Sequence, residues 1–576
     1  MANDRLTEFN LLYDMSDITA LKDSTPSTTF NKSFADISLL KNMIETPGQM
    51  TLEHNYCVLD GQQEEFDDEP DTIAFFTDAM SDDNGDFAVT PYIDISFTEM
   101  HSSFALTISF IDDYPLQIKC TWYQSGDVVF QNIYNVTENN FIVPASVSNY
   151  NAIRIEFLKA LPKRYVKINF IRYGVLINWT ENELKSGKLL LERDMLSSRL
   201  SNNALTFEVI DPKDQTNPGN AEGLHNYFQK TQIMYPYEMV NDRRVDLGRY
   251  FLKDFSYSKN LCKVNAVSYL GLFENVQYDK GVMYNGITAG ALLADIFSTL
   301  EIDNYEIDSV TANTLLYGTL VPTNCKQAIQ QILFACNSII DTTNVEKIKI
   351  LKSTSAISGI IERSTKMNTK VTRTDYVSGV AIKYSTYQPS SQNSTEVVKN
   401  VYEAGDYKVV FTTPYRNYTI TNGTITNSST FFVEFTVSAE SAQVIIEADG
   451  YDVVENKETV SRDYIEGGEG ENVKEFTTTL CNAQTAKALA AKILTHYDNR
   501  LEIDIKHIIN SANINERWIV QNSSPGMDNY VGNFTKRSID LVKGFIDTAT
   551  MVGYYDKTDY NYYMDNEIIM DDNVEI

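Results

Sequence analysis

The stretch Pro322–Lys352, PTNCKQAIQQILFACNSIIDTTNVEKIKILK, has the most regular pattern in the chain. Pro322 ends the preceding element, and the hydroxyl of Thr323 is suited to cap the first free amides of a helix. Apolar residues then recur at steps of three and four and predict one buried helical face: Ala328, Ile329, Ile332, Leu333, Ala335 and Cys336. We expect the helix to end at Asn337. The runs 338–341 and 348–351 then predict a hairpin, which makes this segment a compact α+β unit.

This unit resembles the middle domain of phage tail hub proteins, which are also called tail-associated or tail-tip proteins and include baseplate hubs. The resemblance rests on the helix, on the pair Asp341-Thr342 after the first strand, and on the Lys-Ile-Lys-Ile run at 347–350. None of these residues forms a catalytic motif, so the resemblance predicts a fold and does not predict an enzymatic activity.

Residues 59–178 change to short runs in which apolar and polar residues alternate, and they predict a β-sandwich or jelly roll. Asn84-Gly85 predicts a tight turn with a strand on either side. Three short motifs resemble the carbohydrate-binding-module-like domain near the front of many Firmicute-type tail proteins: Leu59-Asp60-Gly61, the run 81–85, and Trp122-Tyr123.

Two later segments resemble the small β-barrels of tail hubs. Leu205-Thr206-Phe207 and the run Gly-Arg-Tyr-Phe-Leu at 248–252 match the first barrel, whereas 378–387 looks like the opening of the second. A strongly alternating stretch interrupts the second barrel, and the amphipathic run 485–500 predicts a helix before its last strands.

The expected fold class is therefore mainly β with α+β portions: a jelly-roll-like sandwich followed by two small hub β-barrels that a helical α+β domain braces. The predicted organisation is as follows: an N-terminal arm (1–58) that packs on a neighbour, the sandwich (59–178), hub barrel 1 (179–274), the helix-bearing domain (275–352), hub barrel 2 (353–394 and 471–560), an inserted β-domain (395–470) and an acidic tail (561–576).

The formal net charge of −30 argues against nucleic acid as a ligand, because phosphate contacts need clustered Lys and Arg. An acidic wall instead lets DNA slide past, although an acidic surface kept for solubility explains the charge equally well. No apolar run is long enough to span a bilayer, and the first ten residues lack the layout of a secretory signal. The six cysteines never form a CxxC pair, so we expect free buried thiols and no structural zinc.

The sequence contains no recognisable catalytic motif, and we expect no catalytic residue, cofactor or metal ligand. The acidic run 82–86 lacks the spacing of a calcium loop and favours a hairpin turn. Trp122 and Tyr123, together with Trp179, could form an aromatic platform for a sugar ring. Because aromatic residues on an alternating strand usually face the core, and neighbours point to opposite faces, only one of Trp122 and Tyr123 should point outward.

The resemblance implies a structural hub at the distal end of a phage or phage-like tail, assembled in the bacterial host cytoplasm and located in the virion tail. It implies a homotrimer, with tail tube and distal tail proteins and spike or fibre proteins as partners, DNA passing without specific binding, and no membrane insertion. Two alternatives stay open. The first is a carbohydrate-binding adhesin that contacts a host surface glycan, and the second is a tail-associated peptidoglycan hydrolase.

Overall fold

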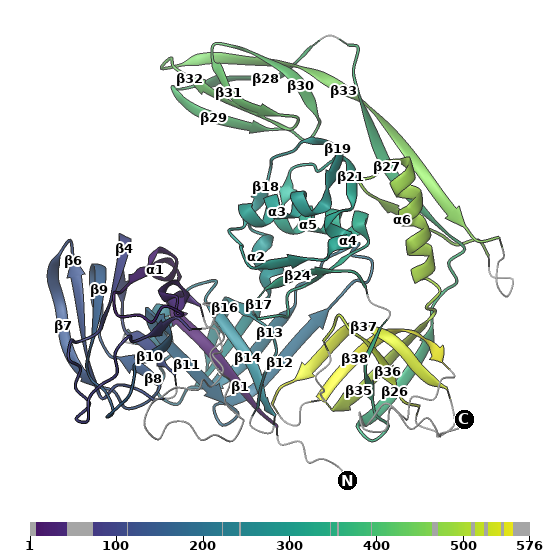
Figure 1. Ribbon diagram of the computed structural model, residues 1–576. Coiled ribbons are helices and arrows are strands. Elements are labelled where there is room, and N and C mark those ends of the chain that lie inside the picture. Colours follow the sequence, from purple (N-terminus) through teal and green to yellow (C-terminus); the bar gives the residue numbers. More distant parts are fainter. Residues whose placement is uncertain are drawn as a thin grey trace. The chain divides into compact units, whose positions relative to one another are not determined.

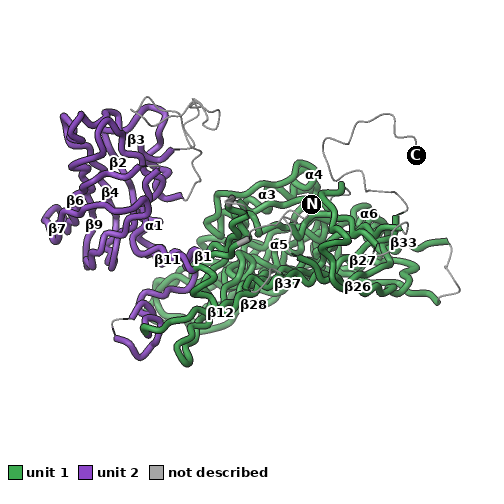
Figure 2. Tube along the Cα trace, turned by 90° about the horizontal axis from the view of Figure 1, so that it is seen from below, with its two compact units in different colours: residues 1–10, 180–213, 235–576 green, residues 11–179, 214–234 purple. Residues whose placement is uncertain are grey.

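The computed structural model is shown in Figure 1. It describes residues 7–42, 73–111, 113–221, 223–240, 243–345, 347–353, 356–392, 394–463, 470–508, 513–522, 528–542 and 546–556. The chain divides into two compact units, which Figure 2 colours separately. Unit 1 comprises residues 1–10, 180–213 and 235–576, and unit 2 comprises residues 11–179 and 214–234. Strands dominate both units, which confirms the predicted mainly β fold with α+β portions.

Unit 2 is a sandwich of two antiparallel sheets with strand orders β2-β4-β9-β6-β7 and β3-β10-β5-β8. Their apolar faces enclose one core, in which Trp122, Tyr150 and Phe157 are among the largest buried side chains. The elements of this part of the chain are β1 Thr7–Ser16, α1 Ile18–Asp23, β2 Thr25–Ser27, the 3-10 helix η1 Ile37–Lys41, β3 Phe75–Phe76, β4 Tyr92–Ser103, β5 Leu106–Phe110, β6 Gln117–Gln124, β7 Asp127–Asn135, β8 Asn140–Val143, β9 Val147–Lys159, β10 Lys167–Arg172, β11 Gly174–Thr180 and the 3-10 helix η2 Leu224–Tyr227. Strands β1 and β11 belong to neither sheet of the sandwich and pair with each other.

The N-terminal segment differs from the predicted arm. Residues 25–27 form β2, which pairs with β4 of the sandwich through Pro26↔Ile95, and α1 precedes it. Ala20 and Leu40 lie in the sandwich core. Residues 11–42 therefore belong to unit 2 itself, because their few apolar side chains complete its core.

Unit 1 contains one long sheet, in which the strands expected for the two barrels are joined. Within unit 1 its order runs β14-β16-β17-β13-β12-β37-β38-β35-β26, and β12 pairs with β37 from Lys188↔Asp540 to Glu192↔Lys536. The strands are β12 Leu184–Glu192, β13 Ala204–Ile210, β14 Ile233–Val240, β15 Arg243–Asp246, β16 Tyr250–Ser258, β17 Leu261–Val267, β25 Ile357–Ile361, β26 Lys366–Arg373, β35 Leu501–Ile508, β36 Arg517–Val520, β37 Asn529–Asp540 and β38 Ile546–Asp556.

The helical part of unit 1 lies in sequence between the two strand sets of that sheet. It consists of α2 Tyr269–Phe273, β18 Gln277–Tyr278, β19 Met283–Thr288, α3 Ala289–Thr299, β20 Tyr305–Ile307, α4 Ser309–Ala312, β21 Leu315–Thr319, β22 Thr323–Asn324, α5 Cys325–Cys336, β23 Ile339–Asp341 and β24 Ile348–Leu351. Helices α3 and α5 bury their apolar faces in one core. The predicted hairpin is confirmed as β23 and β24, which pair antiparallel.

The two ends of α5 show which local signals were correct. The cap is Asn324 and not Thr323: the Asn324 side chain accepts a hydrogen bond from Gln327 N at 2.9 Å. Thr323 lies in β22, and its hydroxyl bonds the side chain of Gln327 instead. Asn337 ends the helix as predicted, in the left-handed conformation with φ 50°. Asn tolerates that conformation better than most residues, which suits it to this position.

The predicted insertion contains the longest strand, β33, which runs from Ala442 to Ser461 and pairs with β27 and β28 (Figure 1). Within the predicted bounds lie β28 Thr395–Tyr402, β29 Gly405–Val410, β30 Tyr415–Thr421, β31 Thr424–Ser429, β32 Phe432–Val437 and β33. The prediction that the run 378–387 opens the second barrel is wrong: it forms most of β27 Gly379–Pro389, which pairs with β33 and with β34 Val473–Thr477 and lies outside the long sheet. Helix α6 Ala483–His496 follows β34 in sequence. Helix α6 packs on Val380 and Ile382 of β27 through Leu489 and Ile493. It starts before the predicted residue 485, because the side chain of Asn482 caps it.

No helix in the described ranges is both long and apolar enough to cross a membrane. The cysteines within those ranges, Cys120, Cys262, Cys325, Cys336 and Cys481, are free and buried. Burial raises the pKa of the Cys325 and Cys336 thiols to about 11, which keeps them protonated at neutral pH. The predicted free thiols are therefore confirmed for these five, and Cys57 lies outside the described residues.

Candidate functional site

Unit 2 contains a pocket of about 280 Å³ between the sandwich and the segment 214–234. The segment connects β13 to β14 in sequence, and two-thirds of the pocket residues come from the sandwich and its N-terminal strand. The lining residues are Met15, Asp17, Ser102, Ser103, Phe104, Ser146, Ser148, Tyr173, Asn226, Tyr227, Gln229 and Gln232. Most of them carry a hydroxyl or amide group, so the pocket presents hydrogen-bonding groups together with aromatic rings.

Gln232 fixes the segment onto the sandwich. Its buried side-chain oxygen accepts hydrogen bonds from Tyr13 Oη at 2.6 Å and from Gln229 N at 3.0 Å. Its amide nitrogen donates to the carbonyl oxygens of Ser16 and Tyr227 at 3.3 and 3.0 Å. Since a buried amide with all four bonds made resists displacement, this wall of the pocket is held in place without a ligand.

An aromatic pair forms part of the wall. The rings of Phe104 and Tyr227 are stacked, with centroids 3.7 Å apart and an angle of 23° between their planes. Tyr227 lies at the end of η2, where the side chain of Asn226 donates to the carbonyl oxygens of Ala221 and Gly223 and so tightens the turn. Tyr227 is 37% exposed, so part of its ring is accessible.

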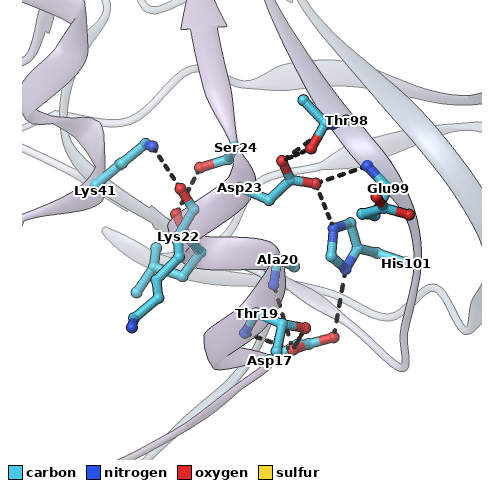
Figure 3. Close-up of polar contacts among 11 residues, drawn as sticks. Asp17, Thr19, Ala20, Lys22, Asp23, Ser24, Lys41, Thr98, Glu99 and His101 are labelled. Atoms are coloured by element: carbon cyan, nitrogen blue, oxygen red, sulfur yellow. Dashed lines mark hydrogen bonds and ion pairs between the residues drawn. The ribbon is translucent and has the colours of Figure 1, made fainter. Parts of the chain in front are cut away.

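Asp17 contributes the pocket's carboxylate, and α1 determines its orientation (Figure 3). Asp17 is the N-cap of α1: its Oδ1 accepts from Thr19 N at 2.9 Å and from Ala20 N at 3.3 Å. Its Oδ2 lies 3.9 Å from His101 Nδ1, a distance too long for a hydrogen bond. This oxygen therefore retains lone pairs that a ligand hydroxyl can meet.

His101 lies between two carboxylates (Figure 3). Its Nε2 is 2.8 Å from Asp23 Oδ2, and its Nδ1 faces Asp17. Hydrogen bonds from the Thr98 side chain, the Glu99 amide and His101 hold the pKa of Asp23 far below its usual range. Only Nε2 is within hydrogen-bond distance of a carboxylate, and the hydroxyl of Ser103 makes no hydrogen bond to His101. The Nε2–Asp23 contact thus links β4 to the end of α1 beside the pocket.

The structure corrects the predicted aromatic platform. Trp122 is 0% exposed and its indole packs edge-on against Phe130 in the sandwich core, so the prediction that Trp122 contacts a glycan is wrong. Trp179 is also buried, at 7% exposure, and packs against Tyr13. Tyr123 follows Trp122 on β6, points to the opposite face and is half-buried. A glycan contact by Tyr123 stays a prediction.

The acidic run 82–86 forms a turn, but not the predicted hairpin. The carboxylate of Asp82 accepts from Asn84 N at 2.7 Å and from Asp86 N at 3.0 Å, and these bonds lower its pKa. A Cβ on Gly85, at φ 83°, would lie 2.2 Å from the carbonyl oxygen of Ala160, which explains the glycine. The turn thus packs on the chain after β9. The strands that flank it in sequence, β3 and β4, lie in different sheets and do not pair with each other, so the turn does not close a hairpin. No group of three or more acidic, His or Cys side chains in the described ranges is placed to hold a metal.

Sequence reasoning did not find the pocket. Its two walls are at least 53 residues apart in sequence, from Tyr173 to Asn226, and the serines and amides that line it occur in ordinary turn-rich contexts. The only signal was the length and polarity of the connection around 211–220, DPKDQTNPGN, which exceeds what a simple hairpin requires.

No family model and no curated protein matches the chain. Among solved structures, it is similar to a tail protein from Neisseria meningitidis MC58, with 8% identity, a TM-score of 0.40 and coverage of 65% of this chain and 93% of that chain. It is similar to a 43 kDa tail protein of prophage MuSo2 from Shewanella oneidensis, with 8% identity, a TM-score of 0.38 and coverage of 66% and 94%. A family 32 carbohydrate-binding module of NanJ from C. perfringens, solved with galactose, aligns with 11% identity over 30% of this chain and 100% of that chain, at a TM-score of 0.18. All three TM-scores are below 0.5, so we base the proposed function on the chain's own motifs and geometry.

Proposed function

We propose that the chain is a structural hub at the distal end of a phage or phage-like tail, where it closes or gates the tail tube and anchors spike or fibre proteins. The observation that carries the proposal is the pairing of β12 with β37. It joins strands about 350 residues apart in sequence into one sheet, from Lys188↔Asp540 to Glu192↔Lys536. The tail-hub-like motifs at 205–207, 248–252 and 347–350 lie in this sheet and in the helical part inserted within its sequence.

Such a sheet is suited to the wall of a tube. Each chain supplies two sets of antiparallel strands, one before and one after the helical part, so three chains supply six sets around an axis. A homotrimer would thereby match a sixfold tail tube. The net charge of −30 supports passage of DNA without specific binding. The partners would be tail tube and distal tail proteins and the spike or fibre, and the location would be the virion tail after assembly in the host cytoplasm.

The function we propose requires no catalysis. The hydroxyl of Ser103 makes no hydrogen bond to His101 in the described ranges, which disfavours a nucleophilic role for that serine. A peptidoglycan hydrolase would give a cleared band in a cell-wall zymogram, and we expect none. A carbohydrate-binding adhesin that uses Tyr123 would lose glycan-array signal on Tyr123→Ala.

The test is the mass and shape of the full chain in solution. Light scattering coupled to size exclusion should give three times the 65.3 kDa of one chain, and negative-stain images should show a ring with a central hole. Purified tail tube protein should co-sediment with this ring. A chain that stays monomeric at micromolar concentration and forms no ring with the tube protein would exclude the hub.

A further inference from the structure

We propose that the pocket between segment 214–234 and the sandwich binds a neutral, hydroxyl-rich ligand of monosaccharide size. The site is separate from Tyr123 on β6, and the proposal does not depend on the hub function. It rests on four properties of the pocket: its volume, its charge, its hydrogen-bonding groups and its aromatic wall.

The volume limits the ligand to about one ring. Pockets for drug-sized ligands hold about 300–1,000 Å³. At about 280 Å³ this pocket lies just below that range, and it is far larger than the space of one water molecule. A single six-membered ring with its substituents is therefore the appropriate size, and a longer chain would have to extend out of the pocket.

The charge of the lining excludes ionic ligands. Among the described residues that line the pocket there is no Lys or Arg, and Asp17 supplies their one carboxylate. A phosphate or an acidic sugar would be repelled by Asp17 without a cation to offset it. A divalent cation needs several oxygen ligands, and the described residues provide no group of acidic side chains for it. A neutral ligand remains.

The polar groups are suited to hydroxyls, which both donate and accept. Ser146 and Ser148 are exposed residues of the lining whose hydroxyls can do either, and Gln229 adds an amide. The buried hydroxyl of Ser103 lies beside that of Tyr150, and neither makes a hydrogen bond of good geometry in the described ranges. Asp17 Oδ2 accepts only. A polyol can satisfy these groups together, whereas an apolar ring would leave them dehydrated and unpaired.

The aromatic wall supplies the apolar contact that a sugar ring also needs. The C–H face of a pyranose can pack against the accessible part of Tyr227, whose other side is stacked on Phe104. Because Gln232 holds the Tyr227 segment by its bond to Tyr13, little ordering cost accompanies binding.

The experiment is saturation-transfer NMR on the full chain with four separate probes: D-glucose, D-galactose, N-acetyl-D-glucosamine and L-rhamnose. At least one sugar should bind to a single saturable site. Tyr227→Ala should weaken that binding at least tenfold, because it removes the stacking surface. Ser148→Val should weaken it similarly, since two methyl groups replace the hydroxyl at the exposed start of β9, where a β-branched residue is tolerated. Tyr123→Ala, the control on β6, should leave it unchanged.

The proposal is overturned if none of the four sugars binds, since the pocket would then hold only water. It is also overturned if binding persists in both Tyr227→Ala and Ser148→Val, or if Tyr123→Ala alone abolishes it. The two pocket variants change different walls, and hydrogen exchange of β4 and β9 should be unchanged in both. Weaker sugar binding with unchanged exchange shows that a contact with the ligand was lost and that the sandwich is still folded.

Discussion

Three strands of the unit 1 sheet meet at a buried charged cluster, which allows a quantitative prediction. Asp547 on β38 is 0% exposed, Arg537 on β37 is 2% exposed and His507 on β35 is 0% exposed. Arg537 Nε donates to Asp547 Oδ2 at 2.7 Å, and His507 Nε2 lies 3.3 Å from the same oxygen. The cluster connects the strands that follow the β12–β37 junction, so its loss should loosen that part of the sheet.

Asp547→Asn preserves the shape of the side chain and removes its charge. Removing one partner of a buried ion pair costs about 3–5 kcal/mol, because the remaining charge stays desolvated. At about 1.4 kcal/mol per tenfold change, the opening equilibrium of β35, β37 and β38 should rise by roughly a hundred- to several-thousand-fold. The main cost arises at Arg537, whose guanidinium would face a neutral amide.

The same substitution predicts a pH dependence. Burial by itself raises the pKa of Asp547, but the charge of Arg537 and the hydrogen bond from His507 outweigh burial and hold the pKa below 3.8. Since the folded pKa is lower than the unfolded one, the carboxylate stabilises the fold fully above pH 3.8, and this contribution is lost as the pH falls through the folded value. The difference between the wild type and Asp547→Asn should therefore narrow below pH 3.8.

Hydrogen exchange with mass spectrometry, read on peptides of the three strands, measures the opening directly. The matched control is Asp498→Asn in the same unit. Its partner Arg462 is at 2.6 Å, but Asp498 is 60% exposed, so the cost should be about 0–1 kcal/mol. An exchange rate in Asp547→Asn that rises less than tenfold, or no more than in the control, would refute the reasoning.

Three further predictions concern single side chains. Trp122→Ala should destabilise unit 2 by about 3–5 kcal/mol in urea unfolding, because it empties the core, whereas Tyr123→Ala should cost less than about 1 kcal/mol; equal effects would contradict the burial of Trp122. Asn337→Ala should cost about 1–2 kcal/mol because of its positive φ, and Asn337→Gly should be close to neutral, as midpoints of thermal unfolding would show. Lys383 and Lys457 lower the pKa of Glu475 to about 2, so the pairing of β34 with β27 should lose stability as the pH falls from 4.5 towards 2, and Glu475→Gln should flatten that acid dependence in hydrogen exchange.

Local patterns were sufficient where one element buries one face. The 3.6-residue period of Ala328 to Cys336 predicted α5 because a helix of that length must bury an apolar stripe, and Asn337 ended it as expected. Alternation likewise predicted β9, in which buried and partly exposed residues alternate, whereas β5 is buried throughout and β7 has no buried residue although both were predicted as strands. Thr323 and Asn324 are both suitable caps by residue type, and only the structure shows that the side chain of Asn324 is the one that accepts from Gln327 N.

The sequence by itself determined the mainly β class, the helix-and-hairpin unit and the free thiols, because each follows from side-chain periodicity or residue type within about twenty residues. Tertiary structure alone decided that β12 pairs with β37, that Trp122 and not Tyr123 is buried, and that Asp17, Ser148 and Tyr227 share one pocket. The physical reason is the separation in sequence of the segments that make contact. Strand partners and pocket walls depend on contacts between segments tens to hundreds of residues apart. The alternation of apolar and polar residues shows that one face of a strand is buried, but it does not show which segment covers that face.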